Sequence, residues 1–109
     1  MKKASMAGRF ELYPVPGAVA VWRTFKNNKP QSTGHMAIVD EDFEIKKWHE
    51  DEENDLRIPM DGYFKTIEGN TNADGGREGK LVAEKSRSFS WTRANGLRLM
   101  GFIHPVENV

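Results

Sequence analysis

Alternating apolar and polar positions divide the chain into short segments of the kind that form β-strands. The alternation is clearest at 18–25, 35–40, 62–69, 79–86 and 97–104, where β-branched and aromatic residues are frequent. Turn-forming residues separate these segments, and no stretch keeps the 3.6-residue period of an amphipathic helix. The pattern therefore predicts a mainly β fold, built as an antiparallel sheet of five or six strands or as a partly open barrel.

Turn signals indicate which segments pair. "PVPG" at 14–17 leads into the first strand, and 18–25 and 35–40 form the first expected hairpin. The glycine-rich "TNADGGREG" joins 62–69 to 79–86 as a second hairpin. Because period-2 strands bury alternate residues, one face of each strand is expected to form the core: Val19, Val21, Met36, Ile38, Phe64, Leu81 or Val82, Leu99 and Phe102.

The segment 40–61 interrupts this regular pattern. "DEDFEIKKWHEDEENDLRIPMD" is rich in acids and keeps neither period over any length, so we interpret it as an excursion. Phe43, Ile45 and Trp48 could continue a strand or cover a core edge, while the run "HEDEEND" is most simply a solvated loop. For the whole segment we favour a surface loop over an inserted flap above the site.

His49 lies among the acids of this segment, but the spacing and glycine turn of a cation-binding loop are missing. "NTNADGG" also lacks the closing glutamate of a calcium loop. We predict no metal and no cofactor.

Length and charge set further limits. At 109 residues the chain fits a single domain, 1–109, and we expect residues 1–8 to be disordered. Sixteen basic and sixteen acidic residues cancel, so no nucleic-acid or membrane partner is expected. No apolar segment follows the opening lysines, which favours a cytoplasmic location for the chain as synthesised. The chain has no cysteine, so it holds neither a disulfide nor a thiol nucleophile.

Three polar residues at strand ends could carry chemistry. His35 begins one strand, while Glu68 and Asn70 end another, and antiparallel neighbours bring such ends together. An imidazole whose one nitrogen is held by a carboxylate or amide can accept a nucleophile's proton at the other. The structural alternative is that His35 is a strand-edge histidine bonded to backbone and Glu68 a solvated turn residue. For His104 and Trp91, packing roles are the simpler interpretation.

Four segments, "PVPGAVAVWR", "STGHMAIV", "TIEGNTNADGGREGKLVAEKSRS" and "LMGFIHP", together resemble the CHAP family over residues 13–105. CHAP domains are cysteine- and histidine-dependent amidohydrolases and peptidases of phage endolysins and bacterial wall enzymes, with a papain-like fold. The resemblance implies that His35 is the general base, that Glu68 and Asn70 orient it, and that the partner is peptidoglycan or a peptide.

The chain departs from this family at the nucleophile. The family's cysteine begins a helix upstream of the "PGAVAVW" strand, and neither is present, so the resemblance implies the β half of a papain-like (α+β) fold that is inactive alone. A hydroxyl could replace the thiol, but none lies at the family's position. The alternative function is a non-catalytic binding or interaction module for peptide or cell-wall glycan, with a second copy or another chain covering the sheet face. The hydroxyls considered are Ser32, Thr33, Ser86 and Ser88.

Overall fold

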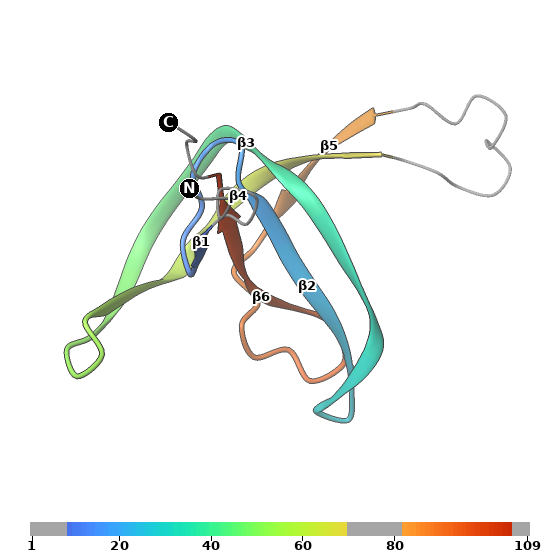
Figure 1. Ribbon diagram of the computed structural model, residues 1–109, viewed down its shortest axis with the longest axis horizontal. Helices are drawn as coiled ribbons and strands as arrows, with labels where there is room; N and C mark the ends of the chain where they lie inside the picture. The colour runs from blue at the N-terminus through green and yellow to red at the C-terminus, as the bar shows by residue number, and fades with distance from the viewer. Residues whose placement is uncertain (1–8, 70–81, 106–109) are drawn as a thin grey trace, which may run out of the picture.

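The computed structural model describes residues 9–69 and 82–105, which form six strands and no helix (Figure 1). Neighbouring strands all pair antiparallel in the order β1-β6-β2-β3-β4-β5, and the sheet is not closed into a barrel. This confirms the predicted mainly β antiparallel fold. The strands are β1 (Arg9–Glu11), β2 (Val19–Lys26), β3 (Lys29–Asp51), β4 (Leu56–Gly69), β5 (Val82–Arg87) and β6 (Gly96–His104).

Both predicted hairpins are present. Strand β2 pairs with β3 from Val19–Ile38 to Lys26–Lys29, across a two-residue turn. Asn27 and Asn28 form that turn with positive φ angles of 52° and 64°, as expected for the turn type whose twist matches a hairpin. Strand β4 pairs with β5 as predicted for 62–69 and 79–86, of which 79–81 lie outside the described residues. The expected disorder of 1–8 also concerns residues outside this description.

Strand β3 bends strongly and connects two hairpin arms (Figure 1). Its 23 residues would span about 75 Å if straight, yet the largest dimension of the molecule is 49 Å. The first part of β3 pairs with β2, and the second part pairs with β4 after register shifts between Val39 and Phe43 and around Lys47. Bulges of this kind bend a strand and increase its twist. We call the β2–β3 end the basic arm and the β3–β4 end the acidic arm.

The surface-loop interpretation favoured for 40–61 was wrong, and the alternative that Phe43, Ile45 and Trp48 continue a strand is confirmed. All but a short turn of this segment belongs to β3 and β4, which pair down to Asp51–Leu56 at the tip of the acidic arm. The same register shifts explain the error, because each one breaks the period-2 alternation that marks a strand in sequence. Phe43 and Ile45 pack against the core, so alternation between buried and exposed residues persists only over short stretches of this segment.

The core lies on one face of the sheet, and it corrects the predicted register of two strands. Phe64, Leu99 and Phe102 are buried as expected. The predictions for β2 and β3 were wrong: Met36 and Ile38 are exposed, and Val19 and Val21 are only partly buried. Leu81 and the side chain of Val82 lie outside the description. The observed core cluster contains Ala18, Ala20, Trp22, Ala37, Val39, Phe64, Phe89, Leu99 and Phe102.

Crowded aromatic rings explain why alanines occupy the inner face. The ring of Phe64 lies 5.2 Å from Phe89 and 5.1 Å from Phe102, and 6.0 Å from Trp22. Rings this close fill the space above the sheet and leave room for methyl groups beneath them. Both faces of β2 and β3 are apolar in sequence, so alternation alone does not distinguish them.

The opposite side of the sheet carries a row of apolar side chains, which we call the outer apolar face. Its members pair directly across five strands, and directly opposed residues project from the same side. The exposed fraction reaches 57% for Phe10 and 52% for Ile38. None of the described residues forms a helix long and apolar enough to cross a membrane. The row consists of Phe10, Ile103, Val19, Ile38 and Ile67.

Candidate active site

His35 lies within β3, which begins at Lys29, so the prediction that His35 begins a strand was wrong. His35 pairs directly with Trp22, and the two ring centroids are 5.3 Å apart. Gly34 precedes it, and a Cβ atom at that position would lie 2.3 Å from the carbonyl oxygen of Trp22. Real Cβ atoms do not approach backbone so closely, so glycine allows the two strands to meet here. The Trp22 ring and the close strand contact hold the imidazole on the core side of the sheet.

Glu68 reaches the same point from β4. Phe64, Thr66 and Glu68 alternate along β4 and are all buried, so the carboxylate projects from the core face. Glu68 Oε1 lies 3.0 Å from His35 Nε2. The contact expected between these two side chains is therefore present. Asn70, the third predicted site residue, lies outside the described residues.

Two further side chains hold the Glu68 carboxylate in place. Arg87 on β5 donates from Nε to Oε2 at 3.0 Å and from Nη2 to Oε1 at 2.8 Å, and Thr66 Oγ1 donates to Oε2 at 2.5 Å. A guanidinium that grips both carboxylate oxygens fixes position as well as charge. Sequence reasoning missed both partners. The two-residue spacing of Thr66 and Glu68 in "TIEG" was a usable signal, whereas Arg87 resembled an ordinary solvated strand residue.

The charge state of Glu68 sets the tautomer of His35. Burial raises the pKa of the Glu68 carboxyl, but hydrogen bonds from Arg87, Thr66 and His35 and the charge of Arg87 outweigh it and lower the pKa to about 2. The carboxylate is therefore ionised at neutral pH and can only accept hydrogen bonds. We infer that Nε2 of the neutral imidazole carries the proton, which leaves Nδ1 as the basic nitrogen.

An open hollow adjoins His35, which we call the histidine hollow. It has a volume of about 790 Å³. His35 is one of its lining residues, and the His35 side chain is 33% exposed. Among the described residues, Nδ1 has no hydrogen-bond partner. A base with one nitrogen fixed and a partly exposed ring is what proton transfer from an external nucleophile requires. The hollow is lined by Val21, Trp22, Arg23, Ser32, Thr33, Gly34, His35, Met36 and Met100.

The hydroxyls that could replace a cysteine lie in two places. Ser32 and Thr33 line the histidine hollow, and Ser86 and Ser88 line a smaller hollow nearby. Over residues 9–69 and 82–105, no hydroxyl is hydrogen-bonded to the His35 imidazole. Within these ranges its one hydrogen-bond partner is the Glu68 carboxylate. A serine or threonine nucleophile therefore has no geometric support in this part of the chain.

His104 and Trp91, for which packing roles were predicted, occupy structural positions. His104 is buried, its Nε2 lies 2.7 Å from the carbonyl oxygen of Tyr13, and the two rings meet edge to face. Trp91 Nε1 donates to the carbonyl oxygen of Pro59 at 2.7 Å. His49 is exposed on β3. Within the described ranges, no three His, Asp or Glu side chains are grouped so that they could hold a metal ion.

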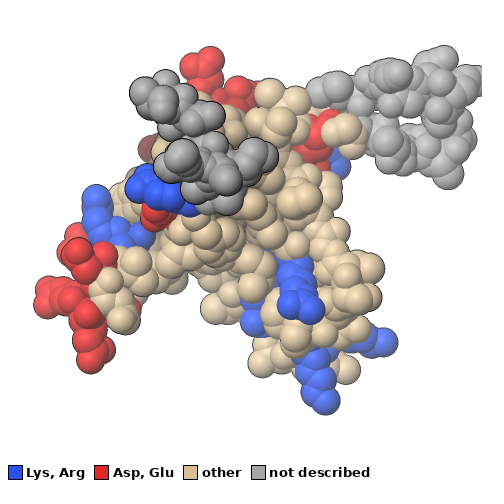
Figure 2. All heavy atoms as spheres, viewed as in Figure 1, with Lys and Arg blue, Asp and Glu red and all other residues tan. Residues whose placement is uncertain are grey.

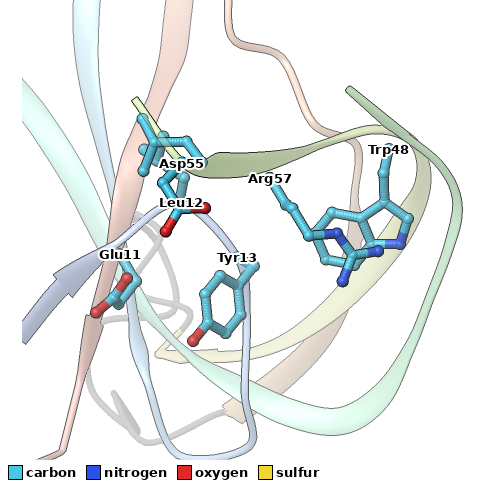
Figure 3. A pocket seen from close by; sticks show the side chains of 7 residues that line it. Glu11, Leu12, Tyr13, Trp48, Asp55 and Arg57 are labelled. Carbon is cyan, nitrogen blue, oxygen red and sulfur yellow. The ribbon is translucent and has the colours of Figure 1, made fainter. Parts of the chain in front are cut away.

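Another hollow, of about 430 Å³, lies between the segment after β1 and the acidic arm (Figure 3). There the Arg57 guanidinium covers one face of the Trp48 ring, 4.2 Å from its centroid. This hollow shares no lining residue with the histidine hollow, so it is not part of the candidate active site. Its lining residues are Glu11, Leu12, Tyr13, Trp48, Asp55, Leu56 and Arg57.

The site thus combines a buried, ionised carboxylate, a guanidinium and a hydroxyl that hold it, and an imidazole oriented by it at the edge of an open hollow. This arrangement can take a proton from a nucleophile and return it, and the chain itself holds no thiol to serve as that nucleophile. No family model matches the chain, and no curated protein or solved structure matches it either.

Proposed function

We propose that this domain is the base-carrying β half of a CHAP-like peptidoglycan amidase or endopeptidase, and that its nucleophile is a cysteine outside these 109 residues. The single observation that carries the proposal is the 3.0 Å contact between His35 Nε2 and Glu68 Oε1. The two residues lie 33 positions apart, and their segments resemble those that carry the general base and the orienting acid of that family. The proposal further includes Asn70 as a second orienting group.

The chemistry follows from the fixed tautomer. When a cysteine is supplied beside the histidine hollow, Nδ1 of His35 takes the thiol proton, and the thiolate attacks the carbonyl carbon of an amide. The imidazolium so formed is stabilised by the ionised Glu68 and gives its proton to the leaving amine. Water then hydrolyses the thioester, with His35 again acting as the base. The isolated chain has no thiol and is inactive in this scheme.

A chimera tests the proposal. The cysteine-bearing helical half of an active CHAP domain, truncated before its own histidine strand, is fused ahead of residue 9, and clearing of a peptidoglycan suspension is measured. We expect clearing by the chimera and none by either half alone. His35→Ala is expected to abolish clearing, and Glu68→Gln to lower it about 100-fold or more, because the orienting charge is lost. His49→Ala, an exposed histidine far from the site in sequence, is the matched control and keeps full activity.

Clearing by the chain alone, or clearing that survives His35→Ala, would contradict the proposal. A chimera that folds by circular dichroism but does not clear the suspension would contradict it as well.

The outer apolar face favours a second candidate function, an interaction module without chemistry. Met36 is 64% exposed and Met100 37% exposed beside the row that runs from Phe10 to Ile67. A contiguous exposed apolar surface is typical of contact sites between proteins. Sedimentation velocity of the chain and of Ile38→Lys distinguishes the cases: a complex that dissociates in the variant supports the interaction module, whereas a monomer in both does not.

A further inference from the structure

A small polar hollow that Trp22 also lines has no part in the proposed proton transfer. Its volume is about 150 Å³, and it lies between the end of β5, the loop 88–95 and the start of β6. Trp22 is a lining residue of both this hollow and the histidine hollow, so the two are neighbours. We call it the serine-arginine hollow, and its lining residues are Trp22, Ser86, Arg87, Ser88, Ser90, Arg93 and Leu97.

The lining of this hollow is suited to an anion. Three serines and two arginines are among its lining residues, and no acidic residue is. Arg87 is already paired with Glu68, so its charge is compensated. Arg93 is exposed and forms no ion pair among the described residues, and it therefore supplies the uncompensated positive charge. Hydroxyl donors and a planar guanidinium are the groups that bind a carboxylate with short, charge-assisted hydrogen bonds.

The loop that carries Arg93 is held in place before any ligand arrives. Arg98 Nε donates to the carbonyl oxygen of Arg93 at 2.9 Å, and the Arg98 guanidinium stacks 3.7 Å from the Phe25 ring centroid. Ser90 is fixed by backbone hydrogen bonds, from its N–H to Ser88 and from Leu99 to its carbonyl oxygen. A site held in its binding conformation avoids the entropic cost of ordering a loop on binding.

The surrounding charge also favours an anion. Residues 12–39 and 85–105 contain no aspartate or glutamate, and these segments build the basic arm and the strands beside the hollow. Lys and Arg side chains gather on that arm, while acids gather at the tip of the acidic arm (Figure 2). The net charge of the chain is zero, but positive and negative side chains are concentrated on different arms. A field of one sign around a small concave site raises the local concentration of its counter-ion.

We propose that the serine-arginine hollow binds a carboxylate, and that the substrate handled at His35 is accordingly a peptide with a free carboxylate close to the bond that is attacked. The binding site stands on its own residues, whereas its use as a substrate subsite rests on the proposed function. The volume of about 150 Å³ accommodates a carboxylate on a short side chain or chain end. A drug-sized ligand needs at least about 300 Å³.

Titration of the full chain with sodium acetate, followed by amide and indole NMR shifts at constant ionic strength, tests this site. We expect saturable shifts at residues 86–93 and at the Trp22 indole, and none with acetamide, which has the same shape but no charge. Arg93→Gln is expected to weaken acetate binding about tenfold, the effect of losing one charged hydrogen-bonding partner. Lys29→Gln removes a charge from the same arm without touching the hollow and is expected to bind as the unchanged chain does.

Other results would overturn the assignment: no saturable shift with acetate, equal shifts with acetamide, or equal weakening by Arg93→Gln and Lys29→Gln. Binding of inorganic phosphate without binding of acetate would replace the carboxylate with a phosphate ligand. Ser88→Ala provides a second variant with the same expected direction if Arg93→Gln does not fold. The titration needs no nucleophile, so its failure would leave the chimera result standing, and an inactive chimera would leave carboxylate binding standing.

Discussion

Replacing Glu68 by glutamine measures how much the buried carboxylate contributes to stability. The pKa of this group falls from its ordinary value of 4.5 to about 2 in the folded chain. Since each unit of difference in pKa corresponds to about 1.4 kcal/mol, the ionised form contributes about 3 kcal/mol to the free energy of unfolding. The side chain is 4% exposed, so solvent screening removes little of this value.

The sign of the pH dependence follows from the lowered pKa. The contribution is complete above about pH 4.5, the pKa of an unfolded glutamate, and is lost as the pH falls toward 2, where the folded carboxyl also takes up a proton. A glutamine resembles the protonated carboxyl in size and charge. Glu68→Gln is therefore expected to be about 3 kcal/mol less stable than the unchanged chain at pH 7 and equally stable near pH 2.

Urea denaturation monitored by tryptophan fluorescence between pH 7 and pH 2 provides these free energies, because Trp22 lies beside the site and reports its loss. Glu50→Gln, which removes an exposed carboxylate 3.5 Å from Arg57, is the matched control and is expected to keep the acid dependence of the unchanged chain. If Glu68→Gln and the unchanged chain lose stability in parallel as the pH falls, Glu68 is not the ionised partner described above.

Two further substitutions test the packing around the site. Gly34→Ala is expected to destabilise the chain by about 1–3 kcal/mol in thermal unfolding, because its Cβ would meet the Trp22 carbonyl oxygen at 2.3 Å; an unchanged melting temperature would mean that β2 and β3 are not so close. Phe64→Ala is expected to cost about 3–5 kcal/mol, and Ile38→Ala much less, since Phe64 is fully buried and Ile38 is 52% exposed; the reverse order would restore the register predicted from sequence.

The strands and the His35–Glu68 contact could be predicted because each depends on local pattern. Alternation over six to eight residues identifies a strand, and His35 on one strand and Glu68 near the end of another meet once the strands are neighbours, although β3 begins at Lys29 and not at His35. The inner face of β2 and β3 could not be predicted, because valine, isoleucine and methionine on one side compete with alanine and tryptophan on the other. The rings of Phe64 and Phe102, from distant strands, decide that choice.

Arg87 and the acidic arm escaped prediction for a different physical reason. An arginine between two serines has the sequence appearance of a solvated position, and only its register opposite Phe64 brings it to the Glu68 carboxylate. In 40–61 the register shifts in β3 remove the alternation that would have marked the strands. In both cases the deciding information is the pairing between strands, which a single sequence does not contain.

The position of β6 has a consequence for how the sheet forms. Strand β6 is the last in the chain, yet it lies between β1 and β2 and aligns Ile103 with Val19. The hairpins β2–β3 and β4–β5 can close locally and early, whereas β2 keeps one open edge until a strand about 80 residues later arrives. Trp22 lies on β2, and its partner on β6 is Leu99. During synthesis the His35 and Glu68 strands can therefore meet well before the tryptophan beside them gains its second neighbour, and an unpaired edge of β2 is the surface most exposed to misassembly in that interval.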